Sequence, residues 1–203
     1  MPAESVNGTT LNYEQRGKGM PVVLLHAFPL DNRIWQGQLV SLSDRYRVIT
    51  PDLRGFGKSP SADAFTMDSL AEDVHALLER IGALPCVLGG LSMGGYIAFA
   101  FAKKYLSDLR GLVLLDARAE ADTAQGKQKR DEMIAAVRTG GSKVAADAML
   151  PKLLADESIH HKPELVRQVK SIMESQPPLT VEHALEALRD REDHVRNLPS
   201  IAV

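Results

Sequence analysis

Residues Leu84–Tyr105 read LPCVLGGLSMGGYIAFAFAKKY. A short apolar run, Cys86–Leu88, ends at two glycines, and Gly90–Gly94 then spells the pattern G-x-S-x-G around Ser92. The residues that follow are apolar on most faces until a pair of lysines, which is typical of a buried helix. A buried strand, a tight turn centred on a serine and a buried helix together form the context in which this pattern indicates a nucleophile.

The spacing of the glycines around Ser92 has a steric reason. A serine on a sharp strand-to-helix turn takes strained backbone angles and brings its neighbours close to the strand and the helix. Small residues are therefore needed two positions before and after it, where Gly90 and Gly94 stand. The turn directs the first N–H groups of the helix at whatever the serine attacks. A glycine-rich turn with an incidental serine is the alternative, and the fit of strand, turn and helix favours the nucleophile.

Length, charge and cysteine content limit the kind of protein this is. The 203 residues suffice for one domain with a sizeable core, or a core with a small insert. The net charge of −2 and the lack of a basic stripe argue against nucleic acid as a partner. Cys86 is the single cysteine, and the N-terminus lacks the basic and apolar regions of a signal peptide. We therefore expect a soluble cytoplasmic protein with no membrane partner, no metal and no cofactor.

Strands alternate with helices from the N-terminus to residue 116. The sequence predicts a hairpin with an Asn-Gly turn, apolar strands, and a helix that starts at Thr66 and stops at Gly82. The expected strands after the hairpin are Pro21–Leu25, Tyr46–Thr50, the run before Ser92, and Gly111–Leu115. Runs that are apolar on both faces are typical of parallel strands covered by helices on each side. The fold class is therefore α/β with a mostly parallel sheet.

The hydrophobic pattern of the sequence changes after Asp116 from alternating strands and helices to helices alone. Residues 117–196 contain no convincing strand, and apolar stripes predict helices separated by glycines and prolines. The four expected helices are Thr123–Val137, Ser142–Leu150, Pro163–Met173 and Thr180–Arg189. We therefore divide the chain into an α/β core at 1–116, an all-helical cap at 117–196, and a return towards the core at 197–203.

Three motifs, in this order and at these intervals, carry a family resemblance. They are His26-Ala27-Phe28-Pro29, Asp52-Leu53-Arg54-Gly55-Phe56-Gly57-Lys58-Ser59 and Gly90-Leu91-Ser92-Met93-Gly94-Gly95. With them the chain resembles the α/β-hydrolase superfamily, in the branch with a helical cap that includes esterases and 3-oxoadipate enol-lactonase-like members. The resemblance is firm from the N-terminal hairpin to residue 116 and covers the cap only in outline.

The resemblance assigns roles to particular residues. Ser92 is the expected nucleophile, and the backbone N–H groups of Phe28 and Met93 are the expected oxyanion hole. His26 is expected to order its loop by hydrogen bonding rather than to act as the base. A serine at position 92, where relatives that open epoxides use aspartate, suits acyl transfer. The expected substrate is a small carboxylic ester or lactone.

The rest of a catalytic triad is not recognisable in the sequence. The family takes its acid and histidine from positions after the seventh and eighth strands, and this chain ends before either of these last two core strands. The downstream histidines, which we expect to be satisfied or surface residues, are His160, His161, His183 and His194. Asp116, at the end of the sixth strand, is the one acid in a plausible position, although a strand-end hydrogen-bonding role is favoured.

Stopping at Val203 also leaves strand 111–115 as an apolar sheet edge. Three explanations stay open: a truncated or cleaved piece of a longer hydrolase, exchange of elements with a second copy, or a short protein that keeps the fold for binding. The first two imply a C-terminal complementing fragment or a homodimer that covers the edge. The competing functional class is a non-catalytic binding module that retains the cap-covered pocket.

Overall fold

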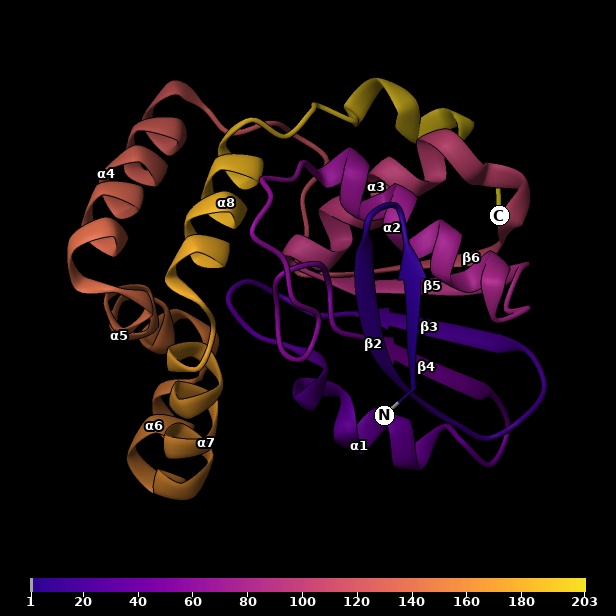
Figure 1. The fold of residues 1–203 in the computed structure, drawn as a ribbon, viewed down its shortest axis with the longest axis horizontal. Helices are drawn as coiled ribbons and strands as arrows, with labels where there is room; N and C mark the ends of the chain where they lie inside the picture. The colour runs from indigo at the N-terminus through magenta and orange to yellow at the C-terminus, as the bar shows by residue number, and fades with distance from the viewer. Residues whose placement is uncertain (1) are drawn as a thin grey trace.

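A single sheet of six strands forms the centre of the protein. The computed structural model describes residues 2–203. The strand order is β1-β2-β4-β3-β5-β6 (Figure 1). The strands are β1 (Ala3–Val6), β2 (Thr9–Arg16), β3 (Pro21–Leu25), β4 (Arg47–Pro51), β5 (Cys86–Leu91) and β6 (Leu109–Leu115). The predicted α/β fold class is confirmed.

The sheet combines an antiparallel hairpin with a parallel section. β1 pairs with β2 and β2 with β4 in antiparallel fashion, whereas β4, β3, β5 and β6 run parallel to one another. Asn7 and Gly8 form the hairpin turn with φ values of 44° and 78°, which is the left-handed region that an Asn-Gly turn supplies. The hairpin predicted from this dipeptide is therefore present.

Helices cover both faces of the parallel strands. On one face, α1 (Gln36–Ser41) and the short 3-10 turn η1 (Asn32–Trp35) bring Trp35 and Leu39 against the sheet. The other face packs against α2 (Met67–Arg80) and α3 (Met93–Tyr105). Successive residues of β3 alternate between the two cores, Leu24 with the first and Leu25 with the second. This two-sided burial is the reason for the continuous apolar runs.

The start of α2 shows how local sequence sets a helix boundary. The Thr66 side chain accepts from the Ser69 N–H, and the Ser69 hydroxyl accepts from the Thr66 N–H. This reciprocal pair is a capping box, and it begins the helix at the residue where the sequence predicts it. At the other end, Gly82 follows the helix with a positive φ of 59°.

Five helices stand beside the sheet rather than on it (Figure 1). They are α4 (Ala124–Gly140), α5 (Ser142–Leu153), α6 (Asp156–His161), α7 (Pro163–Glu174) and α8 (Pro178–Arg189). α4 packs along α8, and α5 packs along α7. The sequence predicts four of them; α6 was missed because six residues are too few to show a helical period. α5 also continues through Pro151, where a boundary was expected. We call these five helices the cap helices.

β6 is the edge of the sheet in the part of the chain that the structure describes. Its last three residues, Val113, Leu114 and Leu115, are exposed by 43%, 38% and 38%. The 3-10 helix η3 (Val195–Ser200) lies beside α3, and Ile201, directly after it, packs against the main core. Among residues 2–203, no helix is long and apolar enough to cross a membrane.

Candidate active site

Ser92 occupies the turn between β5 and α3 with a strained backbone. Its φ and ψ are 50° and −108°, in a region that residues other than glycine rarely adopt. The Ser92 N–H donates to the carbonyl of Leu115 on β6 at 2.8 Å. The Ser92 carbonyl accepts from Gly95 and Tyr96 at 2.9 and 3.2 Å. The strain is therefore held by the neighbouring strand on one side and the first turn of α3 on the other.

Three glycines let the backbone come close around this turn. A Cβ on Gly90 would overlap the carbonyl of Gly94, and a Cβ on Gly94 would overlap the carbonyl of Leu25 on β3. A Cβ on Gly95 would overlap the Cβ of Ala117, in the segment after β6. The steric explanation of the G-x-S-x-G spacing therefore holds for Gly90 and Gly94 atom by atom. Gly95 adds a third close contact, between α3 and the segment that leads from β6 to the cap helices.

The two predicted oxyanion donors have backbone N–H groups without partners. Phe28 lies in the loop after β3 and Met93 is the first residue of α3, and both are buried. Neither N–H donates a hydrogen bond to any group within residues 2–203. An unpaired N–H in a buried setting is rare and costs free energy, so such a pair has a reason to exist. Binding a negatively charged oxygen would satisfy both.

His26 fixes the loop that carries Phe28. Its Nε2 accepts from the Leu53 N–H at 3.1 Å, so its Nδ1 carries the proton and donates to the Ala27 carbonyl, also at 3.1 Å. Burial lowers the pKa of His26 to about 4, so the ring is neutral at neutral pH. Both ring nitrogens are occupied, which confirms the expected loop-ordering role and leaves no free nitrogen for a base.

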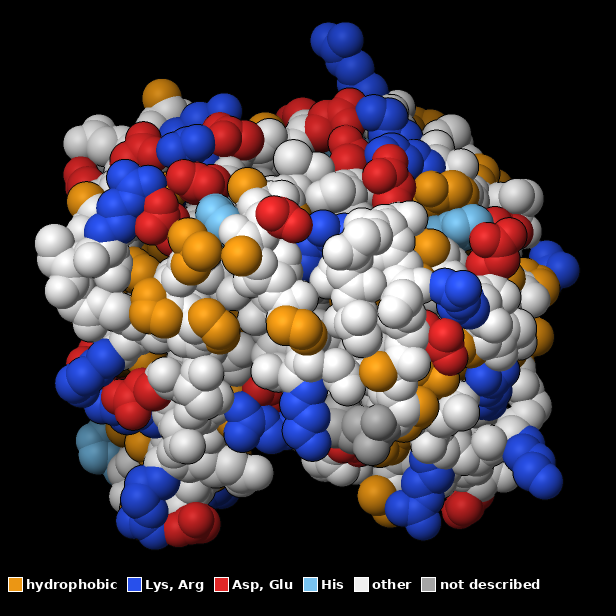
Figure 2. Space-filling view, viewed as in Figure 1, with side chains coloured by type: hydrophobic (Ala, Val, Ile, Leu, Met, Phe, Trp, Pro, Cys, Tyr) orange, Lys and Arg blue, Asp and Glu red, His pale blue; other side chains and the backbone are white. Residues whose placement is uncertain are grey.

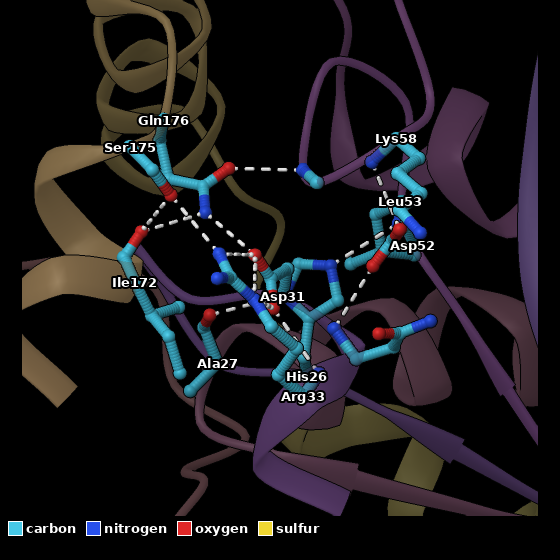
Figure 3. Close-up of polar contacts among 12 residues, drawn as sticks. His26, Ala27, Asp31, Arg33, Asp52, Leu53, Lys58, Ile172, Ser175 and Gln176 are labelled. Atoms are coloured by element: carbon cyan, nitrogen blue, oxygen red, sulfur yellow. Dashed lines mark hydrogen bonds and ion pairs between the residues drawn. The ribbon is translucent and has the colours of Figure 1, made fainter. Parts of the chain in front are cut away.

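A polar network continues from this loop to the loop after β4 (Figure 3). Asp52 accepts from the N–H groups of Asn32 and Lys58, both at 2.9 Å. Burial nevertheless raises the pKa of Asp52 to about 6. Asp31 accepts from Arg33 at 2.8 Å, and the hydrogen bonds of Arg33 and Gln176 hold the pKa of Asp31 below its usual range in spite of its burial.

Gln176 connects this network to the cap helices. It follows α7, is buried, and donates through Nε2 to the Asp31 carboxylate at 2.9 Å and to the Ile172 carbonyl at 2.8 Å. Its Oε1 accepts from the Gly57 N–H at 2.9 Å (Figure 3). One side chain therefore joins the loop of Phe28, the loop of Asp52 and the cap. Nothing in the local sequence marks Gln176 as a functional residue, because Asp31 and Gly57 lie more than a hundred residues away along the chain.

No histidine in residues 2–203 reaches the hydroxyl of Ser92, which has no hydrogen-bond partner there. The rings of His160 and His161 hydrogen-bond to carbonyls of their own helix. His183 packs edge-on against Phe65, and His194 is buried and stacks on Phe99. The expectation that these histidines are satisfied or exposed therefore holds for His160, His161 and His194, whereas the half-buried His183 forms no hydrogen bond within residues 2–203.

Asp116 directly follows β6 and has a φ of 44°, again in the left-handed region. Its carboxylate forms no hydrogen bond or ion pair within the described residues. The strand-end hydrogen bond that we favoured for this carboxylate is therefore absent. Among residues 2–203 there is also no group of three His, Cys, Asp or Glu side chains placed to hold a metal ion.

A cleft of about 670 Å³ opens between Phe28 and the cap helices. Its apolar lining comes from Phe28 and from Met133, Met149 and Leu185 of the cap. This volume is typical of small-molecule sites. The rest of the lining is largely charged and includes Asp122, Lys129, Arg130, Glu132 and Lys152. Ser92 itself does not line the cleft, so of the predicted site residues only Phe28 does.

Comparison with known proteins places the fold in a family. A model described as alpha/beta hydrolase fold matches residues 20–165, which is most of the chain. The chain belongs to the alpha/beta hydrolase fold family. The match spans all three motifs and the first cap helices, so the resemblance drawn from the motifs is confirmed.

Individual relatives of this hydrolase cover nearly all of its chain. It is 32% identical to the AB hydrolase superfamily protein YisY of Bacillus subtilis over 96% of its own length and 74% of that protein's. A thermophilic esterase from Thermogutta terrifontis has 39% identity and a TM-score of 0.92, over 98% of this chain and 75% of that one. The enol-lactonase from Burkholderia xenovorans LB400 has 25% identity and a TM-score of 0.91, over 100% and 78%. Family membership with these relatives supports hydrolase activity.

Proposed function

We propose that this hydrolase acts on a carboxylic ester or lactone through an acyl-enzyme, with Ser92 as nucleophile. The observation that carries the proposal is the strained turn at Ser92, together with the N–H groups of the buried residues Phe28 and Met93, which no group in residues 2–203 accepts. The esterase and the enol-lactonase among the similar structures support this substrate class.

The proposed reaction has two steps. In the first, the Ser92 oxygen bonds to the carbonyl carbon, a base takes the hydroxyl proton, and the alkoxide leaves with that proton as an alcohol. In the second, water attacks the acyl group, its proton passes through the base to Ser92, and the carboxylic acid is released. The N–H groups of Phe28 and Met93 stabilise the oxyanion that forms in each step.

The base and its acid are proposed to come from outside residues 2–203, because no histidine in this range reaches Ser92. We propose that they reach Ser92 along the edge of β6, from a further segment of the protein, from a C-terminal complementing fragment or from another copy. The exposed Val113, Leu114 and Leu115 support this arrangement, since an apolar edge strand is a template for pairing.

A fluorophosphonate probe tests the nucleophile directly. We expect Ser92 to be labelled, the label to disappear in Ser92→Ala, and the exposed Ser107→Ala to keep it as the matched control. Labelling that requires an added C-terminal segment of a relative would locate the base in that segment. No labelling under either condition would contradict the proposal and favour a non-catalytic binding module.

A further inference from the structure

The hairpin turn of Asn7 and Gly8 places a reactive pair of residues on the surface. Both residues are exposed, and a Cβ built on Gly8 would meet nothing within 4 Å. An asparagine is most prone to deamidation when glycine follows it, because a residue without a Cβ leaves the attack of its amide nitrogen on the carboxamide unhindered. The carboxamide of Asn7 is therefore open to attack by the next residue of its own backbone.

The other three asparagines of the chain lack this feature. Each is followed by a residue with a long side chain, which hinders the same attack. They are Asn12 before Tyr13, Asn32 before Arg33 and Asn197 before Leu198. Asn7 is therefore the asparagine at which we expect the reaction to be fastest.

The carboxamide of Asn7 also contacts a buried ion pair. Its Nδ2 donates to Oδ1 of Asp73 at 3.1 Å, and Asp73, on α2, is 1% exposed. The Asp73 carboxylate also accepts from Nε and Nη2 of Arg54, both at 2.7 Å. Nη2 of Arg54 donates in addition to the Asn7 carbonyl at 3.2 Å. The turn is thereby joined to α2, which lies beside β1, and to the loop after β4 (Figure 1).

We propose that Asn7 is a deamidation site, where a spontaneous reaction with water converts the donor to Asp73 into a carboxylate. First, the Gly8 nitrogen bonds to the side-chain carbonyl carbon of Asn7. The carbon–nitrogen bond of the carboxamide breaks, and the amide nitrogen leaves as ammonia with the proton of the Gly8 N–H. Water then opens the resulting succinimide at one of its two carbonyl carbons, which gives aspartate or isoaspartate. The reaction does not involve Ser92, so it is independent of the proposed function.

Both products disturb the contact with Asp73. An aspartate at position 7 sets one carboxylate against another, so repulsion replaces a hydrogen bond. An isoaspartate carries the main chain through the former side chain and adds one carbon to the backbone of the turn. The two-residue turn fixes the pairing of Val6 with Thr9, and a longer backbone no longer fits it. Deamidation is therefore expected to loosen the hairpin from α2 and from Arg54.

The reaction is tested by incubating the purified protein at mildly alkaline pH and following it by mass spectrometry. Cleavage after Arg16 releases one peptide that holds both Asn7 and Asn12, so fragmentation compares the two sites in the same molecule. We expect Asn7 to gain one mass unit several-fold faster than Asn12, with a share of isoaspartate that protein isoaspartyl methyltransferase labels. Asn7→Gln should abolish the gain at this position, because the longer side chain closes the ring much more slowly.

Asn7→Asp tests the structural consequence separately, because it introduces one of the products directly. We expect its melting temperature to lie about 2–8 °C below that of the wild type. The difference should shrink as the salt concentration rises, because salt screens the repulsion. Gln38→Glu is the matched control: it adds the same charge on α1, at an exposed side chain that forms no hydrogen bond within residues 2–203, and should leave the melting temperature unchanged.

The outcomes that contradict the inference differ for its two parts. Equal rates at Asn7 and Asn12, or no gain of mass at Asn7, would refute the modification site. A melting temperature of Asn7→Asp equal to that of Gln38→Glu would refute the expected loss of the contact with Asp73.

Discussion

The α-carbon of Gly94 lies so close to the backbone carbonyl of Leu25 that no Cβ fits between them. The first turn of α3 therefore packs directly against the end of β3, where the loop that carries Phe28 begins. It therefore sets the position of Ser92 relative to the proposed oxyanion donors.

Gly94→Ala is expected to destabilise the protein, because the new methyl group must displace backbone on β3 or α3. The expected loss in the free energy of unfolding is about 1–3 kcal/mol, as for other overpacked sites. Urea unfolding followed by circular dichroism measures it. Gly37→Ala on α1 is the matched control, because a Cβ there meets nothing within 4 Å, and it is expected to be neutral or stabilising. Equal midpoints for the two variants would contradict the steric explanation.

Gln176→Leu removes the side chain that joins the cap to both loops. The substitution removes the acceptor of the Gly57 N–H and takes one donor from the buried Asp31, at a cost of about 1–3 kcal/mol. Amide exchange at Gly57, measured by NMR, should accelerate by a corresponding factor. Gln128→Leu, on the exposed face of α4, is the control and should leave both stability and exchange at Gly57 unchanged.

The pH dependence of His26 follows from its low pKa. The folded-state pKa is about 4 and the unfolded value is 6.5, so only the unfolded chain gains a proton between these values. The stability contributed by the neutral ring is fully present above pH 6.5 and is lost as the pH falls through about 4. A titration of the ring by 15N NMR should show a neutral, Nδ1-protonated imidazole at pH 5.5. A midpoint near 6.5 would refute this assignment.

Asp52 is expected to change the stability of the protein with pH in the opposite direction to His26, over nearly the same pH range. Its folded-state pKa is about 6 against an ordinary value of 3.8, so the folded protein holds the extra proton between these values. The resulting stability is fully present below about pH 4 and is lost as the pH rises through about 6. A 13C titration of the carboxyl group should therefore give a midpoint about two pH units above the ordinary value. Asp52→Asn should remove this pH dependence, whereas the exposed Asp63→Asn should keep it.

The proposed association along β6 makes a prediction about solution state. We expect the chain to form a dimer, or to bind a complementing fragment, in light scattering across a range of concentrations. Val113→Lys should weaken either association, since a charge on an edge strand opposes pairing. Val40→Lys, at an exposed valine on α1, is the control. A monomer at all concentrations that binds no second polypeptide would contradict the proposal.

Much of the α/β core could be predicted because its signals are local. The Asn7-Gly8 turn, the cap at Thr66 and the glycines around Ser92 each state a backbone requirement within a few residues. The boundaries of the cap helices are predicted less accurately, because there the local signals are weak or misleading. Asp156–His161 is too short for a period, and Pro151 ends no helix in the structure although it usually does.

The parts of the site that depend on distant contacts could not be predicted. The tautomer of His26 depends on an N–H of Leu53, and the role of Gln176 depends on Asp31 and Gly57. These hydrogen-bond partners cannot be predicted from the residue types alone. The charged lining of the cleft could not be predicted either, because only the packing of α4 and α5 shows that Lys129 and Lys152 line one cavity.

The hydrogen bond from the Ser92 N–H to the Leu115 carbonyl has a practical meaning. Opening of β6 breaks this bond and exposes the Ser92 amide proton to exchange with solvent. The exchange rate of that proton therefore measures how often β6 opens. Any polypeptide that pairs with β6 would slow this exchange, even if it never touched Ser92. A single NMR signal can therefore report whether the edge of the sheet is occupied.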